Sequence, residues 1–182
     1  MNVDAIHDDV PIRVLRLRSG ELPALTTRPG PLPGALQSAI ESARSGDAWP
    51  IVVQVVDSSR GEIAPRDTLD RLYAVGMASR FAAEAAGVRI GIDAAGLLAS
   101  VGLDSVLELI DRVNSPSFGW ALRLSAKGDT EAATAIAIRR LDHRLVACLI
   151  EPDATAIAAC LTDALRGAGY DGPMVKMGSA DA

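Results

Sequence analysis

The chain has 182 residues and a formal net charge of −5, and 49% of its residues are hydrophobic although only 3% are aromatic. That length fits one domain with a substantial core, which must be built from Ala, Val, Leu and Ile. The acidic balance argues against a protein that follows a nucleic-acid backbone.

Neither the N-terminal residues nor the cysteines indicate export. The first ten residues, MNVDAIHDDV, lack the apolar core of a signal peptide, and no stretch approaches the ~18 uninterrupted apolar residues of a membrane span. Cys148 and Cys160 form no CxxC pair, and their apolar surroundings favour buried thiols. We therefore expect a cytoplasmic protein that binds no cofactor, nucleic acid or membrane. We expect a single domain over residues 1–182, with flexible ends at 1–11 and 178–182.

Short apolar runs alternate with helical patterns along the chain. Several of the runs are almost continuously apolar, which is typical of parallel strands covered on both faces. The alternation predicts a parallel α/β sheet or barrel. In chain order the elements are the strand Ile12–Leu17, the helix Ala35–Arg44, the strand Ile51–Val56, the helix Asp67–Ala86, the strand Val88–Asp93, a helix that opens at Asp104, the strand Phe118–Leu124, the helix Thr130–Leu141, the strand Arg144–Ile150, a helix from Asp153 to Arg166 and the strand Pro173–Met177.

Three segments each combine a helix or turn motif with a strand. FAAEAAGVRIGID (Phe81–Asp93) has a helix, Gly-Val and a strand; VLELIDRVNSPSFGWALRL (Val106–Leu124) has a leucine-rich helix, Ser-Pro and a strand; LRGAGYDGPMVKM (Leu165–Met177) has a Gly-Tyr-Asp-Gly turn and a last strand. From about Ile51 onward the chain thus resembles the xylose isomerase-like TIM-barrel family. That family includes sugar phosphate isomerases and epimerases and the endonuclease IV type of DNA repair enzyme.

The resemblance implies where metal ligands would stand. The family's first metal glutamate corresponds to Asp93, and the Asp and His of the next strand correspond to Arg123 and Ala126. The following histidine falls near Leu149, and the final glutamate on Met177. Since Mn²⁺, Mg²⁺ or Zn²⁺ needs several carboxylate or imidazole ligands at one point, we expect no metal.

The length predicts a departure from the full family barrel, which has eight strands in ~250 residues. We expect an α/β fold, namely an incomplete (β/α) TIM-like barrel of about six parallel strands alternating with helices. The strand at Ile51 would be about the fourth of the family, so two strand–helix units would be missing. The open sheet edges would need a cover from the N-terminal segment, the proline-rich loop Leu22–Gly34 or a partner chain.

Charged residues follow several predicted strands, at the ends where parallel α/β proteins bind ligands. In an isomerase, Asp93 and Glu151 would be the acid–base pair, and Arg123 would stabilise an anionic substrate. A small sugar or phosphorylated ligand would be held by further polar residues. The other interpretation is that these charges form salt bridges and helix caps, with Asp153 as a cap. The substrate-binding candidates are Asp57, Ser59, Arg60, Lys127 and Lys176.

Two functional hypotheses follow, besides a third possibility, a metal enzyme with ligands at other positions, which the lack of a suitable histidine argues against. The preferred one is a metal-less, non-catalytic relative of the sugar phosphate isomerases and epimerases. It would act as a binding or assembly protein and form a homo-oligomer or dock on a partner subunit that covers the open edges. The alternative is a divergent isomerase or epimerase acting on a sugar or sugar phosphate, which requires Asp93, Arg123 and Glu151 to converge. The assembly hypothesis requires an open edge at Ile12–Leu17 or Pro173–Met177.

Overall fold

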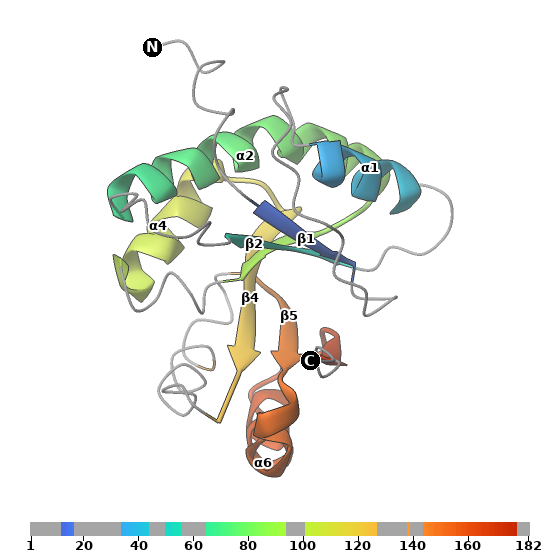
Figure 1. Cartoon of the computed structure of the whole chain (residues 1–182), viewed down its shortest axis with the longest axis vertical. Helices are drawn as coiled ribbons and strands as arrows, with labels where there is room; N and C mark the ends of the chain where they lie inside the picture. Colours follow the sequence, from blue (N-terminus) through green and yellow to red (C-terminus); the bar gives the residue numbers. More distant parts are fainter. Residues whose placement is uncertain are drawn as a thin grey trace.

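The computed structural model describes residues 12–16, 34–43, 50–55, 65–93, 101–126, 138 and 144–177 (Figure 1). These residues form one sheet with helices packed against it. Most of the described elements lie within a residue or two of the predicted ranges, so the prediction of an α/β fold is confirmed. Apart from Ile138, the predicted helix Thr130–Leu141 lies outside the described residues. The elements are β1 Ile12–Arg16, α1 Gly34–Ala43, β2 Ile51–Val55, α2 Pro65–Ala86, β3 Ile90–Asp93, α4 Leu103–Val113, β4 Phe118–Leu124, β5 Leu145–Ile150, a 3₁₀ turn Pro152–Ala154, α6 Thr155–Gly167 and β6 Met174–Lys176.

The order of strands in the sheet is the order in the chain, β1 to β6. Strands β2 to β6 are all parallel, and the sheet curls into a half-barrel. Every parallel connection therefore moves one strand in the same direction, unlike a doubly wound sheet, whose order reverses at a switch point. The carboxyl ends of the parallel strands consequently follow one another along a single curved edge.

The first strand differs from the prediction of about six parallel strands. β1 pairs antiparallel with β2, with Ile12 opposite Val55 and Arg16 opposite Ile51. The sequence offers a physical reason, because IRVLR places charged residues at Arg13 and Arg16 among apolar ones. Such mixing suits a half-covered antiparallel edge strand better than a buried parallel one. The parallel part of the sheet therefore has five strands.

Two apolar clusters lie on opposite faces of the sheet. On the helix-covered face, Trp120 and Phe118 are among the largest fully buried side chains, and α4 contributes a buried stripe that includes Ile110. Alternating strand residues face the other way, where they line the inner side of the curl. That inner cluster consists of Val52, Ala121, Ala147 and Leu149, with Val175 and Met177 packed against it.

Small residues let the sheet curl tightly. A Cβ atom added at Gly119 would overlap the carbonyl oxygen of Arg144 and lie 2.6 Å from Cγ2 of Val146. At Gly91 the nearest atom would be Cβ of Val146, at 3.1 Å. Because only a hydrogen fits at Gly119, strand β5 can approach β4 closely at the register shift between Trp120 and Ala121.

Candidate functional site

Three charged side chains meet at the carboxyl ends of neighbouring strands. Asp93 is the last residue of β3, Arg123 the penultimate residue of β4, and Glu151 directly follows β5. Asp93 lies opposite Ala121 and Arg123 opposite Leu149, and both of those neighbours belong to the inner cluster. Since alternate residues share a face, all three charged residues lie on the inner face. We call Asp93, Arg123 and Glu151 the strand-end cluster.

Arg123 lies between the two carboxylates and contacts both. Its Nε donates a hydrogen bond to Oδ2 of Asp93 at 2.9 Å, and its Nη2 donates to the same oxygen. Its Nη1 donates to Oε1 of Glu151 at 3.0 Å. The guanidinium therefore uses its fork geometry to link the ends of three strands.

The two carboxylates differ in burial. The Asp93 side chain is only 3% exposed, whereas Arg123 and Glu151 are 26% and 28% exposed. Burial by itself lowers the pKa of Arg123, but the charge and hydrogen bonds of Asp93, and then those of Glu151, outweigh it and raise the pKa. With one positive and two negative groups, the cluster carries a net charge of about −1. The ion pair of Asp93 is therefore buried, whereas Glu151 is partly exposed to solvent.

This arrangement limits the chemistry of the cluster. A general base must reach a substrate proton with one of its oxygens, and Oδ2 of Asp93 already accepts two N–H groups from Arg123. An arginine that stabilises an enediolate must offer uncompensated charge, and two carboxylates compensate Arg123. The cluster therefore joins the ends of three strands through ion pairs.

A second set of contacts fastens the same edge. The backbone N–H of Glu151 donates to the carbonyl of Leu124 at 3.0 Å, and Oδ1 of Asp153 accepts from the N–H of Ala126 at 3.3 Å. Asp153 lies in the 3₁₀ turn, and the residue at the N-cap of α6 is Ala154. The predicted cap therefore binds the end of β4 and is not the N-cap of α6.

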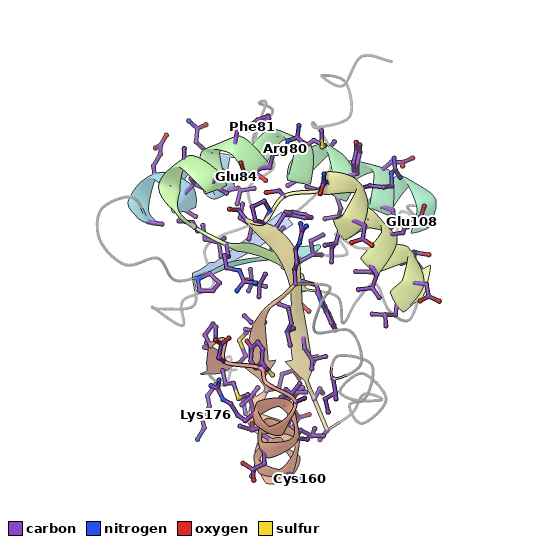
Figure 2. All side chains as sticks on the ribbon, turned by 180° about the vertical axis from the view of Figure 1, so that it is seen from behind. Arg80, Phe81, Glu84, Glu108, Cys160 and Lys176 are labelled. Carbon is purple, nitrogen blue, oxygen red and sulfur yellow. The ribbon has the colours of Figure 1, made fainter. Side chains whose placement is uncertain are left out.

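The remaining predicted site residues do not join the strand-end cluster. Lys176 lies opposite Ile150, which belongs to the core on the helix-covered face, so its side chain lies on the opposite side of the sheet from Arg123. Lys176 is exposed, and Figure 2 shows it pointing outward from the lower part of the molecule. Asp57, Ser59, Arg60 and Lys127 lie outside the described residues.

Positions where the resemblance implies metal ligands have other roles in the fold. Leu149 and Met177 belong to the inner apolar cluster, and Ala126 is exposed after the end of β4. Within the part of the chain that the structure describes, no three His, Cys, Asp or Glu side chains come together. Arg123 is the cation that lies between the carboxylates.

One hydrogen-bond network was not predicted from the sequence. It lies at the opposite, amino-terminal end of the strands, where Oγ of Ser115 donates to Oε1 of Glu84 at 2.6 Å and Arg144 donates to the carbonyl of Ser115. Arg80 donates to the carbonyl of Val113 at 3.2 Å. These bonds hold the turn between α4 and β4, which the Ser-Pro pair in the sequence indicates, so we assign them a structural role.

The comparisons with known proteins leave the family open. No protein-family model matches the chain, and no curated protein matches it. Among the described residues, no helix has both the length and the apolar character that crossing a membrane requires.

Proposed function

We propose that this protein is a metal-less, non-catalytic relative of the xylose isomerase-like barrels that acts as a binding or assembly protein. Its role would be to self-associate, or to dock on a partner subunit, through the open edges of its sheet. The observation that carries the proposal is the strand-end cluster, in which one guanidinium engages both carboxylates that an isomerase would use.

The topology supports the relationship to the barrels. Five parallel strands that follow one another in chain order are what part of a (β/α) barrel contains, and the helices lie on the outer face as they do there. The Gly-Tyr-Asp-Gly and Ser-Pro motifs supply the resemblance to this particular family.

Charge and burial support the absence of catalysis. Asp93 is almost fully buried and paired with Arg123, so a substrate would have little access to this carboxylate.

The second candidate is the divergent isomerase or epimerase acting on a sugar or sugar phosphate. One observation favours it: the three residues that this hypothesis requires do converge on one face of the sheet. In that case a bound substrate would displace Arg123 from Glu151, the more exposed of the two carboxylates.

Hydrogen exchange with solvent separates the two candidates without knowledge of the product. The protein is incubated in D₂O with aldoses, ketoses and their phosphates, with and without Mg²⁺ or Mn²⁺, and deuterium at the carbon next to the carbonyl is followed by NMR. The proposal predicts exchange at the rate of the buffer alone. Faster exchange that disappears in both Asp93→Asn and Glu151→Gln would establish the isomerase instead.

A further inference from the structure

Strand β6 forms one edge of the sheet. It pairs with β5 on one side, and among the described residues no strand pairs with its other side. The opposite edge is formed by β1, whose flanking residues on both sides are not described. An unpaired strand edge is a template for another strand, and natural proteins cover or block such edges.

The hydrogen bonds of β6 reveal which of its backbone groups face outward. The N–H of Met177 donates to the carbonyl of Ile150 at 2.7 Å, and the carbonyl of Pro173 accepts from the N–H of Cys148 at 3.0 Å. In a parallel pair, alternate residues of a strand bond to the same neighbour. Val175 therefore turns its backbone groups toward β5, and Met174 and Lys176 turn theirs away from it.

This spacing makes the edge complementary to itself. If two copies of β6 run antiparallel about a two-fold axis at Val175, Met174 of each copy lies opposite Lys176 of the other. Both residues have outward N–H and C=O groups, so each pair exchanges two hydrogen bonds. Placing the axis at Lys176 would set the two lysines directly opposite one another, which destabilises a sheet.

The side chains of the edge are suited to the same contact. Met174, Val175 and Met177 are each partly exposed, and Lys176 is exposed. Met174 packs on the helix-covered core, and Val175 and Met177 pack on the inner cluster, so the edge presents apolar side chains on both faces of the sheet. In the register about Val175, the methylene stem of each Lys176 covers a Met174 of the other copy.

We propose that two copies of this chain form a closed dimer by antiparallel pairing of β6 with β6 about a two-fold axis at Val175. The inference rests on the proposed assembly function and specifies its partner as a second copy. Because the contact is isologous, it uses the edge once in each copy and stops at two chains. It extends the sheet of one chain continuously into the other.

The first test removes an outward N–H without touching the bonds to β5. Lys176→Pro loses that donor in both copies, and Pro is tolerated in an edge strand whose N–H faces outward. Lys176→Thr keeps the donor and is the matched control. By sedimentation velocity over a concentration series, Lys176→Pro should weaken the dimer by about 30-fold, since two backbone hydrogen bonds are lost. Lys176→Thr should dimerise as the native chain does.

The second test reads the register directly. In the proposed dimer the two Val175 residues form a non-hydrogen-bonded pair with Cα atoms about 4.5 Å apart, within the range of a disulfide. Cys160 is exposed on α6 and is first replaced by Ser (Figure 2). In that background Val175→Cys should form a disulfide-linked dimer on mild oxidation. Lys176→Cys should not, because its two copies would lie about 8 Å apart on the diagonal.

The outcomes distinguish this inference from the function on which it rests. A native chain that stays monomeric at 100 μM or more (about the concentration of a weak dimer) overturns the β6 dimer. So does a dimer that Lys176→Pro leaves intact, or cross-linking through Lys176→Cys in place of Val175→Cys. None of these results touches the absence of catalysis, which only the deuterium exchange measurement tests.

Discussion

Replacing Arg123 by methionine isolates the contribution of the strand-end cluster. Methionine keeps most of the volume of the arginine stem but removes the guanidinium. Asp93, with a side chain only 3% exposed, then loses the opposite charge and the hydrogen bonds of Arg123. Such a loss costs about 3–5 kcal/mol, and partial access of water to the position of Arg123 places the expected value near 3 kcal/mol.

The contribution of Glu151 is smaller. Its side chain is 28% exposed, so its contact with Arg123 at 3.0 Å is worth about 0.5–1 kcal/mol. Glu151→Gln should therefore lower the free energy of unfolding much less than Arg123→Met. The double variant Asp93→Asn, Arg123→Met should lose less than the two single variants together, because the buried charge and its partner are removed at once.

Urea denaturation followed by circular dichroism measures these differences, with the native far-ultraviolet spectrum as the check on fold. An Arg123→Met variant within about 1 kcal/mol of the native chain would refute the reasoning. Equal losses for Arg123→Met and Glu151→Gln would also refute it, because the argument depends on the difference in burial between Asp93 and Glu151.

Two further predictions concern packing and pH. Gly119→Ala should lower the free energy of unfolding by about 2 kcal/mol or more, because its Cβ would overlap the carbonyl of Arg144. The control Gly167→Ala has no atom within 4 Å of the new Cβ, so its melting temperature should change little. Similar losses of melting temperature in both variants would contradict the tight curl. Burial raises the pKa of Cys148 from 9.0 to about 12, so its contribution to stability is complete below about pH 9 and falls by ~1.4 kcal/mol per pH unit as the pH rises toward 12. Cys148→Ala should lose stability less steeply than the native chain over that range in alkaline denaturation curves, and parallel curves would show that the thiol is not responsible.

The sequence predicted the regular elements well because their signals are local. The spacing of apolar residues and the glycine after Ala86 located the end of α2 to the residue, and the run Phe118–Leu124 matches β4. Both depend on hydrophobic periodicity over a few residues, which the chain displays directly. The direction of β1 is a tertiary property, and the mixture of Arg13 and Arg16 with apolar residues was its only local sign.

The site shows where sequence reasoning stops. The ends of β3, β4 and β5 could be predicted, but the distance between Asp93 and Arg123 depends on strand register, which places Asp93 opposite Ala121. From the sequence alone, ion pairing was therefore only one of two interpretations of the charged residues at the strand ends. The face of the sheet on which Lys176 lies could have been predicted. Neighbouring strand residues face opposite sides, so Lys176 lies on the other face from Met177, which packs on the inner cluster.

Arg123 binds both carboxylates of the strand-end cluster and joins the ends of three strands. Guanidinium ¹⁵N–¹H NMR tests this most directly, because an arginine held at Nε, Nη1 and Nη2 rotates slowly and gives separate signals for its two terminal nitrogens. We expect separate Nη signals for Arg123 that merge in Asp93→Asn. A single averaged Nη signal for Arg123 in the native protein would contradict it.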